Sequence, residues 1–193
     1  MKELEEYAMI NKIPIMQKDG ILYLCNYIKE NNIKKILEIG SAIGYSSIMM
    51  ANVNNDIKIT TIEKDKDRYE IAVSNIKKYH KEEQINIIYK DATEIEITDK
   101  FDLIFIDAAK GKNTFFFNKF KDNLNNNGTI ITDNLSFHGL VENENLVKTK
   151  NQKGIVKKIK NYISFLDNNT EFNTTYIPVG DTIAISKRND HNE

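Results

Sequence analysis

The sequence predicts an α/β fold: a doubly wound, seven-stranded, mostly parallel sheet of Rossmann-like type that ends in an antiparallel hairpin. Short apolar runs of β type alternate with helical stripes along most of the chain, as in a parallel sheet covered by helices. The run at 101–106 is almost wholly apolar, as expected of a strand buried on both faces. Two final runs, 174–177 and 182–186, flank Pro178-Val179-Gly180-Asp181, and this turn sequence predicts a hairpin.

The individual elements follow from local periodicity. Residues 4–10 are expected to form a short helix, and Pro14 marks a break after it. Within 20–30, apolar side chains recur at the spacing of one helical face, which predicts a second helix. The remaining strands are expected at 35–40, 57–62, 85–89 and 128–132, and the remaining helices at 46–54, 69–76, 115–124 and 155–166.

The chain is expected to form one domain, 1–193, in which residues 1–31 make an N-terminal helical cap. Its 193 residues match the usual size of about 100–200 residues per domain. No internal repeat, proline-rich linker or low-complexity block divides it, and there are only 2 prolines. A chain of this length buries enough surface to fold without a disulfide or a metal.

Composition excludes several classes of protein. A formal net charge of −1 excludes a uniformly basic protein that coats nucleic acid, but it leaves room for a local basic patch. Cys25 is the single cysteine, which excludes an intrachain disulfide and any thiolate-rich zinc or iron–sulfur site. No apolar run is long enough to span a membrane, and the acidic N-terminus has no signal-peptide core. A cytoplasmic protein with no membrane partner is expected.

The first strand ends in a glycine turn that predicts a ligand site. Ligands of doubly wound sheets bind at the carboxyl ends of the strands, and here Glu38 and Gly40 are followed by Gly44-Tyr45-Ser46. Glycine lets the backbone approach a ligand closely. Ala42 and Tyr45 stand where a dinucleotide fingerprint needs glycine. The turn therefore indicates a nucleoside site without pyrophosphate binding, or else an ordinary turn between a strand and a helix.

Acidic residues follow the next two strands. Glu63 ends the second strand, where a carboxylate can accept hydrogen bonds from ribose hydroxyls; the alternative is a solvated charge beside Lys64 and Lys66. Asp91-Ala92 follows the third strand, where the acid can accept from an adenine amino group or cap a helix. Three such features in order, at three successive strand ends, favour a nucleoside site.

The fourth and fifth strands end in further polar residues. Asp107 and Lys110 follow the fourth strand, and Asp133-Asn134 follows the fifth. Carboxylate and amide oxygens are hard ligands that suit Mg²⁺, Mn²⁺ or Ca²⁺. The alternatives are an ion pair between Asp107 and Lys110 and a simple turn at 133–134.

With these motifs, the sequence resembles the class I S-adenosylmethionine-dependent methyltransferases. More narrowly, it is similar to the metal-dependent O-methyltransferases of the catechol and caffeoyl-CoA type. The resemblance extends from about Pro14 to Lys187 and implies the Rossmann-like methyltransferase fold and a homodimer. The motifs that carry it are Glu38-Ile-Gly-x-x-x-Gly44-Tyr-Ser46, Glu63, Asp91-Ala92, Ile106-Asp-Ala-Ala-Lys110 and Thr132-Asp-Asn134.

The resemblance also implies roles for individual residues. The expected contacts of the cofactor S-adenosylmethionine are Met16, Glu38, Gly40, Ser46, Glu63, Asp91, Ala92 and Asp107. Of these, Ser46 would lie near the carboxylate of the methionine part, and Met16 would close over the cofactor. The expected metal ligands are Asp107, Asp133 and Asn134, with Mg²⁺ as the first choice. Lys110 matches the general base, so Lys110 and Asp107 are the expected catalytic residues.

Within the family, the sequence is most similar to the bacterial branch that methylates 5-hydroxyuridine at the tRNA wobble position. The runs at 106–111 and 177–186 carry this likeness. Asn113 replaces a tyrosine of many relatives, and Asp181 replaces the glutamate with which catechol enzymes grip their substrate. The alternatives are methylation of catechol-like small molecules and, from another class, a non-catalytic RNA-binding module.

A lysine-rich segment agrees with a tRNA partner. The segment from Lys148 to Lys160 contains six lysines and no acidic residue, and phosphate contacts by such a segment make affinity depend on salt. The anticodon loop would present its wobble base unpaired. The alternative is an ordinary exposed face in a lysine-rich protein. The residues expected to contact RNA are Lys148, Lys150, Lys153 and Lys157.

Overall fold

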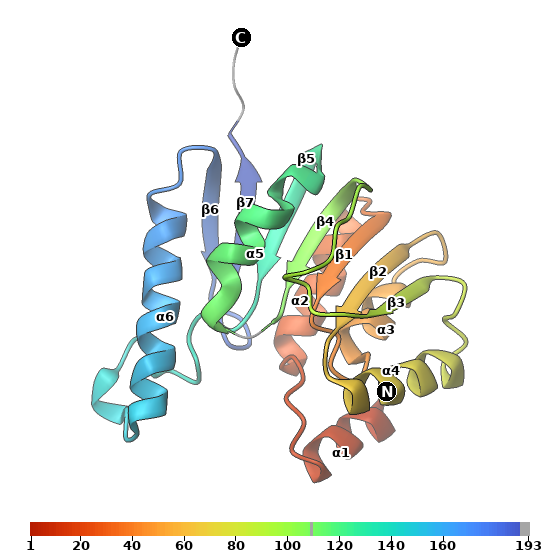
Figure 1. The fold of residues 1–193 in the computed structure, drawn as a ribbon, viewed down its shortest axis with the longest axis horizontal. Coiled ribbons are helices and arrows are strands. Elements are labelled where there is room, and N and C mark those ends of the chain that lie inside the picture. The colour runs from red at the N-terminus through yellow and green to blue at the C-terminus, as the bar shows by residue number, and fades with distance from the viewer. Residues whose placement is uncertain (109, 190–193) are drawn as a thin grey trace.

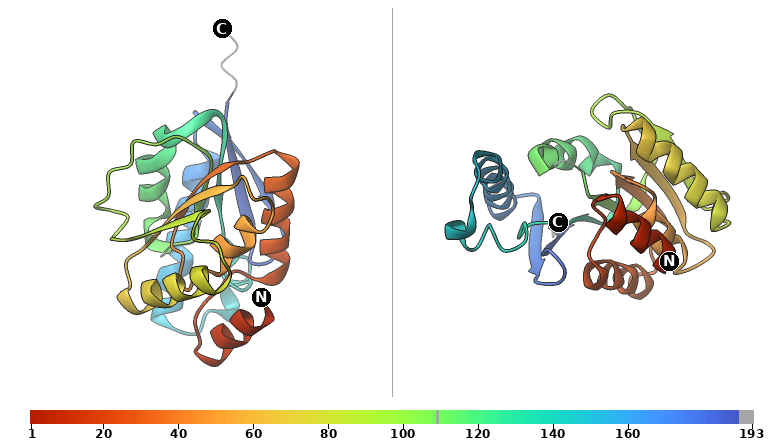
Figure 2. Two further views of the ribbon diagram at one scale, coloured as in Figure 1. Left: turned by 90° about the vertical axis from the view of Figure 1, so that its right-hand side faces the viewer. Right: turned by 90° about the horizontal axis from the view of Figure 1, so that it is seen from below.

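The computed structural model describes residues 1–108 and 110–189, without the side chain of Lys110. Its centre is one seven-stranded sheet in the order β3-β2-β1-β4-β5-β7-β6, with helices on both faces (Figures 1 and 2). The strands are β1 (Lys35–Ile39), β2 (Lys58–Glu63), β3 (Ile85–Tyr89), β4 (Phe101–Ile106), β5 (Leu124–Thr132), β6 (Phe172–Ile177) and β7 (Ile183–Arg188).

The predicted fold class is confirmed. β1 to β5 pair in parallel, while β7 runs antiparallel to both β5 and β6. From β1 the chain winds outward through β2 to β3, and then crosses to the other side of β1 to form β4. This reversal between β1 and β4 is the point at which doubly wound sheets bind ligands.

The helices agree with the expected ranges except at their ends. They are α1 (Lys2–Ile10), α2 (Lys18–Glu30), α3 (Tyr45–Ala51), α4 (Lys66–Lys78), α5 (Asn113–Phe120) and α6 (Lys150–Asp167), with 3-10 turns η1 (Lys110–Lys112), η2 (Lys121–Asn123) and η3 (Glu144–Leu146). Of the helices in the described residues, none is long and apolar enough to cross a bilayer.

Two elements, β5 and α6, begin four and five residues earlier than expected. β5 starts at Leu124, before the predicted 128–132, because Leu124 pairs with Phe101 across a register irregularity in β4. α6 starts at Lys150 because Thr149 and Gln152 form a capping box: the Thr149 hydroxyl accepts from the Gln152 N–H, and Gln152 Oε1 accepts from the Thr149 N–H, each at 3.1 Å. The apolar stripe from which the sequence placed this helix begins one turn later.

The core forms two layers, one on each face of the sheet. Alternate strand residues point to opposite faces, so Ile36 joins the cluster under α1 to α4, and its neighbour Leu37 joins the cluster under α5 and α6. Phe117 and Tyr162, both almost fully buried, fill the second cluster. These layers hold the carboxyl ends of β1, β2 and β4 side by side, where the site lies.

Candidate active site

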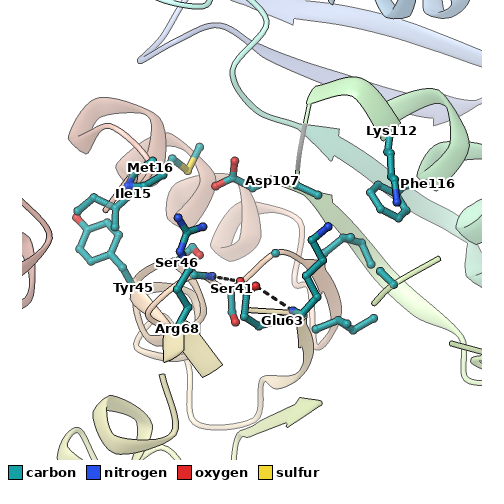
Figure 3. Close-up of a pocket in the computed structure, with 18 of the residues that line it drawn as sticks. Ile15, Met16, Ser41, Tyr45, Ser46, Glu63, Arg68, Asp107, Lys112 and Phe116 are labelled. Carbon is teal, nitrogen blue, oxygen red and sulfur yellow. Dashed lines mark hydrogen bonds between the residues drawn. The ribbon is translucent and has the colours of Figure 1, made fainter. Parts of the chain in front are cut away.

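A pocket of about 330 Å³ opens at the carboxyl ends of β1, β2 and β4 (Figure 3). The segment between α1 and α2 forms one wall with Ile15 and Met16, and the start of α5 contributes Phe116 to another. The sequence-predicted residues that line the pocket are Met16, Gly40, Ser46, Glu63, Asp91, Ala92, Asp107 and Asn134.

The turn after β1 requires glycine at two positions. Gly40 has φ +96°, and a Cβ there would lie 2.6 Å from the carbonyl oxygen of Asp107. Gly44 has φ +83° and precedes α3. Residues with a side chain rarely adopt these angles. The close approach of Gly40 to Asp107 brings the ends of β1 and β4 together at the base of the pocket.

Glu38 lies behind the pocket wall and does not line the cavity. It is fully buried, and its carboxylate accepts hydrogen bonds from Ser46 Oγ at 2.5 Å, from Ser47 Oγ, and from Thr61 Oγ1 at 2.5 Å. Burial raises the pKa of Glu38 above its ordinary value. Its carboxylate joins the start of α3 to β2, so it positions the pocket wall, and the expected direct contact with the cofactor stays a prediction.

Glu63 joins the turns that follow β1 and β2. Its Oε2 accepts from the Ala42 N–H at 2.9 Å, and its Oε1 accepts from the Lys64 and Asp65 N–H groups, each at 2.9 Å. The residue is only 7% exposed, which excludes the alternative of a solvated surface charge. A carboxylate fixed in this way presents its remaining lone pairs to hydroxyl donors in the pocket.

Asp91 holds a turn after β3; no helix of the described structure lies between β3 and β4 for it to cap, and its role as an acceptor for adenine stays a prediction. Its Oδ1 accepts from the N–H and the hydroxyl of Thr93, each at 2.9 Å, as a turn residue does. Its Oδ2 lies 3.7 Å from Lys64 Nζ and 3.9 Å from Lys112 Nζ. The hydrogen bond from the Thr93 N–H is the main cause that lowers the pKa of Asp91. Asp91 is therefore an ionised acceptor at the β3 side of the pocket.

The three expected metal ligands come together. Asn134 Nδ2 donates to Asp107 Oδ1 at 3.0 Å and to Asp133 Oδ2 at 2.9 Å. The amide nitrogen and oxygen of asparagine are assigned from their surroundings, so the reverse orientation would place three oxygens together. That donor set suits a hard divalent cation. Within the described ranges, no group of three or more His, Cys, Asp or Glu side chains could hold a metal, so the set depends on the Asn134 amide.

The expected catalytic pair is only partly described. Asp107 lines the pocket directly after β4. Lys110 begins η1, but its side chain lies outside what the structure describes, so its role as base stays a prediction. Ala109, between them in sequence, also lies outside the described residues.

The expected RNA-contacting lysines lie on or beside the exposed face of α6. Lys148, Lys150, Lys153 and Lys157 are all exposed. Lys158, next along the helix, packs on η1: a Cβ at Gly111 would lie 3.0 Å from Lys158 Nζ. Since η1 ends at the pocket residue Lys112, α6 packs beside the pocket rim at Lys158.

Several pocket residues were not identified from the sequence. They include Ile15, Ser41, Arg68 and Phe116. Ser41 is 2% exposed, and its hydroxyl has no hydrogen-bond partner in the part of the chain described. Arg68 lies four residues before Ala72, which packs on Gly44, so helical periodicity after Glu63 is the signal that could have found it.

Comparison with known proteins assigns the family. A family model described as O-methyltransferase matches residues 1–189. A caffeoyl-CoA O-methyltransferase of Populus kitakamiensis is 28% identical over 202 residues, which cover 97% of this chain and 86% of that enzyme.

Solved structures agree with this match. A candidate caffeoyl-CoA O-methyltransferase from Staphylococcus aureus is 37% identical, with a TM-score of 0.93 over 97% of this chain and 91% of that one. The O-methyltransferase of Bacillus cereus, solved in complex with SAH, shares the fold at 22% identity, with a TM-score of 0.81 over 97% of this chain and 90% of that one. Because the family model covers almost the whole sequence, this chain belongs to the O-methyltransferase family, a family of S-adenosylmethionine-dependent enzymes.

Proposed function

We propose that this enzyme transfers the methyl group of S-adenosylmethionine, with the help of a divalent cation, to 5-hydroxyuridine at the wobble position of tRNA, and so forms 5-methoxyuridine. The cofactor would place its ribose at Glu63 and its adenine beside Asp91 and Ala92, because these residues line one end of the pocket. Its methionine part would extend toward Ser46 and Asp107. The cofactor supplies an electrophilic methyl group on a sulfonium.

The residues at the other end of the pocket fit a divalent cation. Asp107, Asp133 and Asn134 would hold it, since their side chains already lie within hydrogen-bond distance of one another. A bound Mg²⁺, or Mn²⁺ or Ca²⁺ in its place, lowers the pKa of a hydroxyl acceptor. Asp107 would contact both the cofactor and the cation, because it lines the cofactor pocket and also contacts Asn134.

The chain's own residues would align the reactants and remove one proton. Methyl transfer from a sulfonium is an in-line displacement, so alignment supplies much of the rate. Ile15, Met16 and Phe116 line the pocket with apolar surface that keeps water from the reacting atoms. Lys110 would accept the proton of the substrate hydroxyl, since a neighbouring divalent cation depresses the pKa of a lysine.

The observation that carries the tRNA substrate is the position of α6, with its exposed lysines, beside the pocket. Lys158 packs on η1, which ends in pocket residue Lys112, so phosphates bound along α6 would lie next to the pocket entrance. An unpaired wobble base could then enter without melting a duplex. The 5-hydroxyl and 4-oxo groups of 5-hydroxyuridine form a two-oxygen chelator like a catechol. This substrate also implies a cytoplasmic enzyme.

A catechol-like small molecule is the second candidate. The caffeoyl-CoA O-methyltransferase of Populus kitakamiensis, similar over most of its length, favours it. Asp181 argues against it: this residue is 3% exposed, and its carboxylate accepts from the His138 N–H at 2.6 Å. Through Oδ1, Asp181 therefore holds the loop after β5, and its Oδ2 is buried without a hydrogen-bond partner in the described structure. A catechol enzyme would need an acid that is exposed to the substrate.

The test is a direct comparison of acceptors. Purified enzyme with S-adenosylmethionine and Mg²⁺ is given tRNA that carries 5-hydroxyuridine, the same tRNA without it, or a free catechol, and products are identified by mass spectrometry. We expect 5-methoxyuridine only in the modified tRNA, and loss of product when a strong chelator is added. Preferred methylation of catechol would support the second candidate, and full activity in chelator would contradict the metal role.

We also propose a homodimer. Met9 and Ile10 are neighbours at the end of α1 and are each 73% exposed, and contiguous exposed apolar surface marks interaction sites. Light scattering after gel filtration should give twice the chain mass. A single-chain mass at micromolar concentration would contradict the dimer.

A further inference from the structure

Arg68 projects into the pocket from the first turn of α4, and the roles proposed above make no use of it. Its guanidinium points into the cavity, on the side of Ser46 and Tyr45 and away from Lys112 (Figure 3). Its backbone N–H donates to Asp65 Oδ1 at 3.0 Å, but no carboxylate among the described residues forms an ion pair with the side chain. An arginine that lines a pocket without a carboxylate partner is suited to an anionic group of a ligand.

Helical periodicity places Arg68 over the turn that follows β1. Arg68 and Ala72 are four residues apart, so they share one face of α4. A Cβ at Gly44 would lie 3.5 Å from Ala72 Cβ, which shows that this face packs on the turn before α3. Arg68 therefore lies at the end of the pocket that Tyr45 and Ser46 form.

The other described cations of the pocket gather at its opposite end. Lys64 and Lys112 both lie within 4 Å of Asp91 Oδ2, at 3.7 and 3.9 Å. Lys90 is exposed and directly precedes Asp91. These lysines therefore surround Asp91, which would contact the nucleoside part of the ligand. Arg68 lies at the other end of the pocket.

Ser46 alone cannot satisfy an anion there. A serine hydroxyl has one proton, and Ser46 donates it to Glu38 Oε1 at 2.5 Å. The hydroxyl of Ser46 is therefore not available to a ligand carboxylate. The guanidinium of Arg68 presents N–H groups in a fork that matches the two oxygens of a carboxylate.

We propose that Arg68 binds the α-carboxylate of the methionine part of S-adenosylmethionine. The cofactor carries a single carboxylate, at the end opposite its adenine. With the ribose at Glu63 and the adenine at Asp91, the methionine part extends to the end of the pocket where Arg68 and Ser46 lie. This assignment rests on the proposed placement of the cofactor and does not depend on the metal or on the methyl acceptor.

A ligand that lacks only the carboxylate tests this assignment. The affinities of S-adenosylhomocysteine and of its decarboxylated analogue, S-adenosyl-3-thiopropylamine, are measured by calorimetry. Arg68→Gln should lower the affinity for S-adenosylhomocysteine about 10- to 100-fold, which is the effect of losing a hydrogen bond to a charged group. The affinity for S-adenosyl-3-thiopropylamine should change by less than about twofold. Arg68→Lys, which keeps the charge and loses the fork, should fall between the wild type and Arg68→Gln.

Lys64→Gln is the matched control, because it removes the same charge at the opposite end of the pocket. It should change the two affinities by the same factor. The assignment would be overturned if Arg68→Gln lowered the affinities for both ligands equally at an unchanged melting temperature. It would also be overturned if the variant bound S-adenosylhomocysteine as tightly as the wild type. A wild-type enzyme that bound neither ligand would contradict the placement of the cofactor itself, so the two failures are distinguishable.

Discussion

At the scale of single residues, Glu38 shows that a motif can identify a functional residue without predicting where its side chain points. The motif associates Glu38 with the cofactor, but side chains of a strand alternate between faces. Ile36 points to the α1–α4 side, and Leu37 and Ile39 point to the other. Glu38 therefore points under α3, where it accepts from Ser46 and Ser47. Strand periodicity could have predicted this direction, but the three hydroxyl partners depend on how α3 and β2 pack.

The buried carboxyl of Glu38 should make stability depend on pH. Burial raises its pKa above the ordinary 4.5, so between 4.5 and the raised value the unfolded chain releases a proton that the folded chain keeps. The free energy of unfolding of the wild type should therefore fall as pH rises through this window, by up to about 1.4 kcal/mol per pH unit relative to Glu38→Gln. Urea unfolding of both proteins at a series of pH values measures this difference, and parallel curves would contradict it.

Asp107 and Lys110 should differ in the size of their effects. Asp107→Ala removes a side chain that lines the cofactor pocket and contacts Asn134, so turnover should be abolished. Lys110→Ala removes only a proton acceptor, which is typically associated with a 10²- to 10⁴-fold loss of rate, and residual activity should rise with pH as the acceptor ionises unaided. Single-turnover rates measure both. Equal loss in the two variants at high pH would contradict a base role for Lys110.

At the scale of elements, the start of α6 was less predictable than its body. The apolar stripe from Ile155 identified the helix, but its first turn, with Lys150 and Lys153, is polar and exposed. Thr149 fixes the start of the helix, because its hydroxyl accepts a hydrogen bond from the Gln152 N–H.

Thr149→Ala should lower the free energy of unfolding by about 1 kcal/mol, as measured by urea unfolding. Thr170→Ala, which removes an exposed hydroxyl without a hydrogen bond in the described structure, should leave it unchanged; equal effects would contradict the capping role.

At the scale of the whole molecule, the distribution of charge matters more than its sum. The net charge is −1, so the proposed binding of tRNA would need a local basic surface. The surface that we propose is the face of α6 that bears Lys153 and Lys157. Replacing both by Gln should raise the KM for tRNA and weaken its salt dependence, with kcat unchanged, because phosphate contacts position the substrate without touching the reacting atoms. Lys29→Gln with Lys35→Gln makes the same change of charge at the opposite end of the sheet, where α2 ends and β1 begins. The KM should stay at the wild-type value in this control. An equal rise of KM in both double variants would show that bulk charge governs binding, and the α6 face would then no longer be the tRNA site.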